Sequence, residues 1–81
     1  KYRNVGVNVT VVRGSVEKLH HTTVLVDDAA PDSLVAAVES LWNEVRQCAR
    51  AGKVVYLMAP NHRFVVGVMP ADILTISAVR P

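Results

Sequence analysis

Valine alternates with polar or small residues through the first part of the chain, from Tyr2 to Val12. The odd positions hold Val5, Val7, Val9 and Val11, and the even positions between them hold Gly, Asn and Thr. A period of two is typical of a strand with one face in the core and the other toward solvent. The pattern stops at Gly14-Ser15, and a second extended run rich in Thr and Val follows over Glu17–Asp27. We expect these two segments to pair as a β-hairpin.

A helix is predicted over Pro31–Ala51. The preceding segment, Asp27–Ser33, contains three Asp and one Pro, which is typical of a helix start because the first turn tolerates Pro and favours carboxylates. Gly52 is expected to end the helix as a left-handed cap. Apolar residues recur at three- and four-residue steps and make one stripe. This stripe consists of Leu34, Val38, Leu41, Trp42, Val45, Cys48 and Ala49.

The last third of the chain predicts three more strands. Val54–Ala59 and Phe64–Met69 are separated by the turn Pro60–Arg63, and a final strand, Ile73–Val79, follows a break at Pro70. A short last helix is the alternative, but its β-branched residues favour a strand. The two middle strands are apolar at almost every position, which is typical of strands covered on both faces.

The predicted order is therefore β-β-α-β-β-β, an α+β fold with a single helix packed on one face of a mixed sheet. The 81 residues form a single small domain over residues 1–81. Because the chain starts at Lys1 without Met and ends at Pro81, a fragment of a longer protein is a second interpretation. No element covers the other face of the sheet.

This element order resembles the ubiquitin-like β-grasp over the whole chain. The resemblance implies that the last strand lies parallel to the first at the centre of the sheet. The chain ends Val79-Arg80-Pro81 and not Gly-Gly. The conjugation and sulfur transfer of that family are therefore not implied.

A local resemblance covers Val65–Leu74. Its V-G-V strand followed by D-I-L is similar to the strand-to-helix segment of CBS modules. The resemblance implies nucleotide sensing, which we keep as a second alternative function. The helix predicted over Pro31–Ala51 is longer than such a module contains, and Thr75-Ile76-Ser77 continues a helix poorly.

Composition limits the class of protein. Hydrophobic residues make up 51% and charged residues 20% of the chain, which excludes a disordered chain. The apolar runs are too short to span a bilayer, so we expect a soluble protein without a membrane partner. The net charge is only +2 and the basic residues are scattered, so no nucleic-acid partner is expected. The single Cys48 excludes an internal disulfide and is compatible with a reducing compartment such as the cytoplasm.

The sequence contains no motif that predicts catalysis or a cofactor. His20 and His21 are adjacent, so on a strand their rings point to opposite faces and cannot share a metal. The glycines are isolated, which argues against a phosphate-binding loop, and no serine lies in a nucleophile turn. We therefore expect no metal and no cofactor, and an enzyme is the less favoured interpretation.

Surplus apolar residues carry the functional hypothesis. The mean hydropathy of +0.26 is high for so small a domain and predicts apolar surface left uncovered. We therefore expect a protein-interaction or assembly module, either a homo-oligomer or a part docked on its parent chain, acting through an apolar sheet surface or an exposed sheet edge. The alternative is small-ligand binding or catalysis at an inter-subunit site using His20, His21, His62 or Arg63. The expected interface consists of Tyr56, Met58, Phe64, Val66 and Val68, with His62 and Arg63 at its rim.

Overall fold

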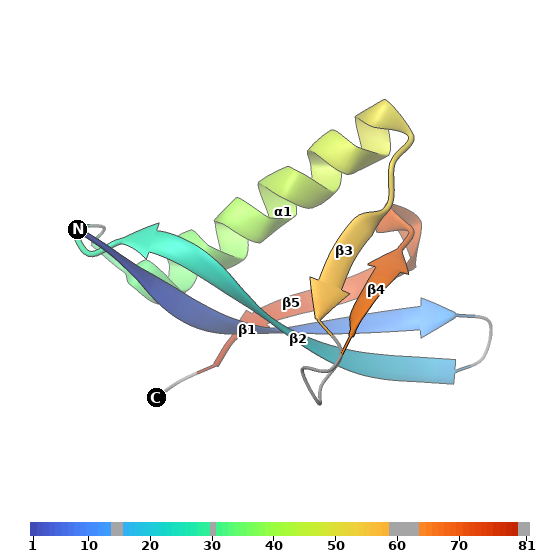
Figure 1. Ribbon diagram of the computed structural model, residues 1–81, viewed down its shortest axis with the longest axis horizontal. Coiled ribbons are helices and arrows are strands. Elements are labelled where there is room, and N and C mark those ends of the chain that lie inside the picture. The colour runs from blue at the N-terminus through green and yellow to red at the C-terminus, as the bar shows by residue number, and fades with distance from the viewer. Residues whose placement is uncertain (14–15, 30, 59–63, 80–81) are drawn as a thin grey trace.

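A long twisted hairpin forms the base of the molecule (Figure 1). The computed structural model describes the backbone of residues 1–13, 16–29, 31–58 and 64–79, and their side chains except at residues 13 and 16–21. Strands β1 (Tyr2–Arg13) and β2 (Val16–Asp27) pair antiparallel without interruption, from Tyr2 opposite Asp27 to Arg13 opposite Val16. The alternation predicted for β1 is confirmed, because its four odd-numbered valines from Val5 to Val11 are at most 4% exposed.

Helix α1 (Ser33–Ala51) is capped by Asp32 at its start and by Gly52 at its end. Asp32 has extended backbone angles, and its Oδ1 accepts hydrogen bonds from the amides of Leu34 at 3.0 Å and Val35 at 3.3 Å. These bonds satisfy amide donors that have no partner within the helix. Pro31 lies before this cap and not in the first turn. Gly52 ends the helix with φ +67°, which confirms the predicted left-handed cap.

The remaining strands separate into two groups. Strands β3 (Val55–Met58) and β4 (Val65–Val68) pair only with each other in the described residues. After the short 3-10 helix η1 (Pro70–Asp72), strand β5 (Ile73–Ala78) pairs with β1, giving the order β2-β1-β5. The α+β class and the order β-β-α-β-β-β are confirmed.

The sheet pairing differs from the prediction in its direction. Strand β5 does lie beside the central strand β1, but it runs antiparallel to it. All strand pairs among the described residues are antiparallel, so the mixed sheet is wrong, and the parallel pair that a β-grasp requires is not formed. Element order alone cannot distinguish these arrangements, because both place the last strand beside the first.

A bulge in β5 brings two isoleucines to the same face. The register with β1 shifts between Thr10 and Val11, so that Thr75 pairs with Thr10 and Ile73 pairs with Val11. Leu74 is therefore the extra residue of β5 and is 53% exposed. In a regular strand without the extra residue, Ile73 and Ile76 would point to opposite faces, because they are three positions apart. Both are instead buried in the core.

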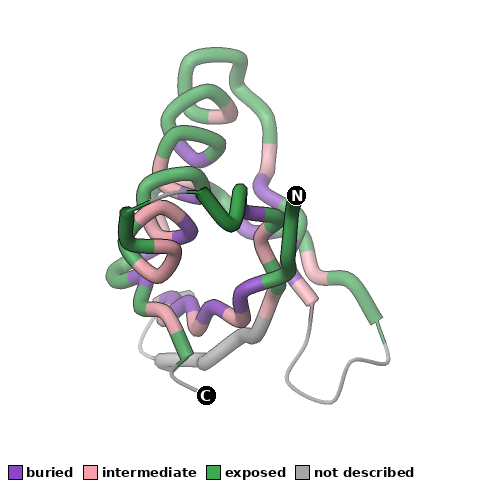
Figure 2. Tube along the Cα trace, turned by 90° about the vertical axis from the view of Figure 1, so that its left-hand side faces the viewer, coloured by how far each residue is buried: buried purple, intermediate pink, exposed green. Residues whose placement is uncertain are grey.

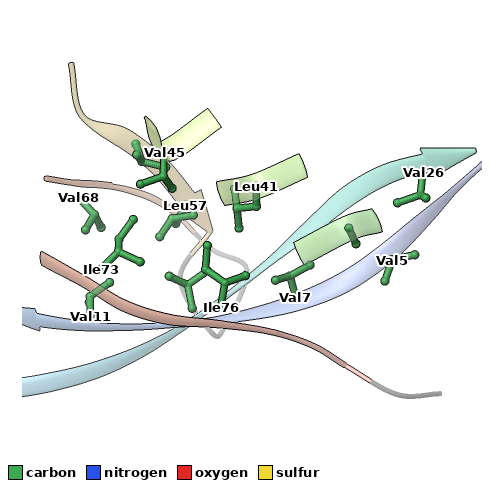
Figure 3. Packing of buried hydrophobic residues seen from close by; sticks show 13 residues of the cluster. Val5, Val7, Val11, Val26, Leu41, Val45, Leu57, Val68, Ile73 and Ile76 are labelled. Carbon is green, nitrogen blue, oxygen red and sulfur yellow. The ribbon is translucent and has the colours of Figure 1, made fainter. Parts of the chain in front are cut away.

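The core lies between α1 and the two sheets. Figure 2, which looks along the long axis of the molecule, shows the helix and the strands around a common interior with buried positions turned inward. In Figure 3, Leu41 of α1, Leu57 of β3 and Ile76 of β5 meet there. Helix α1 contacts β1, β2 and β5, and thus covers one face of the three-stranded sheet. Among the described residues, no helix has both the length and the apolar character needed to cross a membrane.

Candidate functional site

The β3–β4 ribbon has one buried face and one exposed face. Val55 and Leu57 are 1% exposed and Val68 is 0% exposed, so these residues close one side of the core. In the register of the pair, Tyr56 lies opposite Gly67 and Met58 lies opposite Val65. Paired residues of an antiparallel ribbon share a face. These four residues therefore lie on the side of the ribbon that faces away from the core.

This exposed side continues one residue beyond each strand. Val54 precedes β3 and Met69 follows β4, and each has the same alternation as the outward residues of its strand. The backbone position of Gly67 has Val54 and Tyr56 beside it: a Cβ built on Gly67 would stand 3.4 Å from Val54 Cγ2 and 3.6 Å from Tyr56 Cε1. We call this surface the outer face. It consists of Val54, Tyr56, Met58, Val65, Gly67 and Met69.

The outer face is apolar and accessible. Tyr56 is 70%, Val65 57% and Met69 53% exposed, while Val54 and Met58 are half-buried. The only polar side-chain group among the six residues is the Tyr56 hydroxyl. Exposed apolar residues that adjoin one another in a small domain commonly mark a contact with another protein. The outer face is thus an apolar contact surface whose one hydroxyl belongs to Tyr56.

Of the five predicted interface residues, Tyr56 and Phe64 are exposed, Met58 and Val66 are half-buried, and Val68 is buried. Tyr56 and Met58 lie on the outer face, and Phe64, just before β4, is 57% exposed. Val66 packs partly buried against the core. Placing Val68 at a surface is wrong, because it pairs with Val55 and is fully buried.

Sequence reasoning missed Val54, Val65 and Met69. The signal that could have found them is parity: once Tyr56 points outward, its strand neighbours two residues away and their cross-strand partners point outward as well. Using that signal requires the register of β3 and β4. Because both strands are apolar at nearly every position, the sequence did not supply it.

The other candidate residues are not brought together into a described site. His62 and Arg63 lie outside the described residues, as do the side chains of His20 and His21, whose backbones pair with Val9 and Asn8 in β1. Among the residues that were described, no group of three His, Cys, Asp or Glu side chains could hold a metal ion. Cys48 is half-buried and packs against the core.

The segment that resembles a CBS module has a different local structure. Val65–Val68 is a strand as the resemblance implies, but Pro70–Asp72 is a single 3-10 turn, and Ile73–Ala78 is a second strand where a helix should begin. The strand-to-helix context that the motif needs is therefore not present.

The carboxylates before the helix have structural roles. Asp27 Oδ1 accepts a hydrogen bond from the Ala29 amide at 2.9 Å, and Asp28 forms an ion pair with Arg3 at 3.5 Å between Oδ1 and Nε. The guanidinium of Arg3 also donates to the hydroxyl of Ser33. Together with the Asp32 cap, these contacts attach the helix start to β1. They explain the acidic cluster without a bound cation.

Comparisons with known proteins add no family. No protein-family model matches the chain, and no curated protein and no solved structure is significantly similar to it.

Proposed function

We propose that this chain is an assembly module that associates with a second copy of itself through the outer face. The observation that carries the proposal is the uncharged, accessible surface formed by Tyr56, Met58, Val65 and Met69 on a paired ribbon. Interfaces between identical subunits are more apolar than the rest of a protein surface and contain few charges at their centre. The outer face has both properties.

The test is the molar mass in solution, measured by light scattering over a hundredfold dilution. We expect a mass above 8.8 kDa at the highest concentrations and a shift toward the monomer on dilution. The variant Val65→Glu places a charge on the outer face and should remain monomeric throughout, because an unpaired carboxylate would be buried in the interface. Val65 is exposed in the single chain, so the fold should tolerate this change.

The matched control is Ser40→Glu, which places the same charge on an exposed position of α1. It should associate as the unmodified chain does. A monomer at every concentration of the unmodified chain would contradict the proposal, and so would an unchanged mass for Val65→Glu.

A further inference from the structure

A second exposed apolar surface lies at the open end of the β1–β2 hairpin. Tyr2 pairs with Asp27, and Asn4 pairs with Leu25, so Tyr2 and Leu25 are diagonal neighbours on the same face of the hairpin. Tyr2 is 67% exposed and Leu25 is 62% exposed. We call these four residues the hairpin end. They lie on the face of the sheet that α1 does not cover, because Val5 and Val26, on the other face, are buried in the core.

The hairpin end and the outer face belong to opposite ends of the molecule. The structure measures 39 × 29 × 19 Å along its principal axes. In Figure 1, where the long axis is horizontal, the N-terminus and the start of α1 lie at the left, whereas the end of α1 and the β3–β4 ribbon lie at the right. The two surfaces are therefore separate patches of one copy.

The two ends differ in the sign of their charge. Residues 44–58 and 64–72 contain the cations Arg46, Arg50 and Lys53 and the carboxylates Glu44 and Asp72. All three cations are exposed and have no ion pair among the described residues. Lys53 directly precedes the outer-face residue Val54, so its Cα lies within about 10 Å of that of Tyr56 along the strand.

Residues 25–33 have the opposite character. They contain Asp27, Asp28 and Asp32 and no cation. Lys1 and Arg3 lie at the same end, and Arg3 is paired with Asp28. The charges at this end therefore sum to −1 (three carboxylates and two cations), against +1 at the other end (three cations and two carboxylates). The two patches are therefore complementary: each offers apolar side chains, and the net charge beside one is negative where that beside the other is positive.

We propose that the outer face of one copy receives the hairpin end of the next copy, in a head-to-tail contact. This inference rests on the proposed function, because it names the surface that occupies the outer face. Tyr2 and Leu25 would contact Tyr56 and Val65, with the Asp27 side of one copy near the Lys53 side of the other. Two different patches meet in such an interface, so a pair of copies keeps one free patch of each kind, and the association can continue to a ring or an open chain.

Mixing two variants tests this geometry. Val65→Glu disables the outer face and leaves the hairpin end intact, whereas Leu25→Lys disables the hairpin end and leaves the outer face intact. Each variant alone should be monomeric. An equimolar mixture should form a complex of two chains and no larger species, because one intact patch of each kind remains in the mixture. Light scattering of each variant and of the mixture gives the masses, and circular dichroism with urea unfolding shows that both variants are folded.

The outcomes separate the two proposals. If Val65→Glu is monomeric but Leu25→Lys associates as the unmodified chain does, the outer face is the docking surface and the head-to-tail contact is wrong. If both folded variants are monomeric and their mixture also stays monomeric, the head-to-tail contact is likewise overturned. If the unmodified chain is itself monomeric at every concentration, the proposed function fails, and the inference fails with it.

Discussion

At the residue scale, the outward side of β1 contains a buried polar atom that no described residue satisfies. Asn8 lies in the central strand between β2 and β5, with Cα partners His21 and Ser77. Its Oδ1 is buried and has no hydrogen-bond partner among the side chains and backbone that the structure describes. An acceptor removed from water without a replacement bond lowers stability, and Asn is also a poor strand former. Asn8 is thus a local cost in an otherwise consistent strand.

We predict that Asn8→Val raises the free energy of unfolding by about 1 kcal/mol, because it removes the unpaired acceptor and supplies a β-branched side chain. Urea unfolding measures the change. Thr23→Val is the matched control: it lies on the same side of the hairpin and is exposed, so its effect should stay below about 0.5 kcal/mol. A loss of stability in Asn8→Val would mean that Asn8 has a stabilising partner.

At the scale of elements, local signals define the helix and the hairpin, and one irregularity defines β5. The Asp32 cap and the left-handed Gly52 limit α1 to Ser33–Ala51, close to the range that the apolar stripe predicts. Strand β5 shows no regular alternation in its sequence, yet Ile73 and Ile76 are both buried. The bulge at Leu74 explains how Ile73 and Ile76 can both be buried although they are three positions apart.

We predict that deletion of Leu74 is tolerated, with a change in unfolding free energy within about 1 kcal/mol. The deletion makes Ile73 and Ile76 two positions apart, so a regular strand would still direct both to the core. Deletion of Asn8 should cost more than about 3 kcal/mol or prevent folding, because β1 pairs on both sides and every valine beyond the deletion would change face. Thermal and urea unfolding of the two deletion variants provide the measurement. Equal damage from both deletions would contradict the role assigned to the bulge.

At the scale of the whole molecule, charge is distributed along the long axis. Arg46, Arg50 and Lys53 lie in or just after the second half of α1, and Asp27, Asp28 and Asp32 lie before its start. The helix therefore separates the carboxylates from Arg46 by about 20 Å and from Lys53 by about 28 Å. This arrangement also agrees in sign with the helix dipole, which favours carboxylates at the start and cations at the end. The charges at either end are exposed to solvent and are therefore accessible to salt.

We predict that salt weakens the self-association of this chain. Raising NaCl from 50 to 500 mM should increase the apparent Kd by roughly threefold to tenfold, because the attraction between exposed charges of opposite sign is screened. Light-scattering isotherms at the two salt concentrations measure the effect, and Lys53→Gln should reduce the salt dependence. An association that is unaffected or strengthened by salt would show that apolar contact alone forms the interface.

The sequence by itself determined the elements whose signals are local. The period of two fixed the buried side of β1, and the spacing of apolar residues with Asp32 and Gly52 fixed the helix, because neighbouring residues of one segment contain all the required information. The outer face was predicted only in part. Tyr56 and Met58 do lie on the outer face, whereas Val65 and Met69 were not named in the prediction, and Val68, which was, is buried in the core.

Only the tertiary structure decided how the last three strands are arranged. A strand that is apolar at every position carries no preference for one side, so the side that Val68 and Leu57 present to the core depends on pairing with a distant segment. The direction of β5 beside β1 likewise depends on a contact between residues more than 60 positions apart. Such pairings depend on how α1 and both sheets bury their apolar side chains in one common core. A short segment of neighbouring residues does not contain that information.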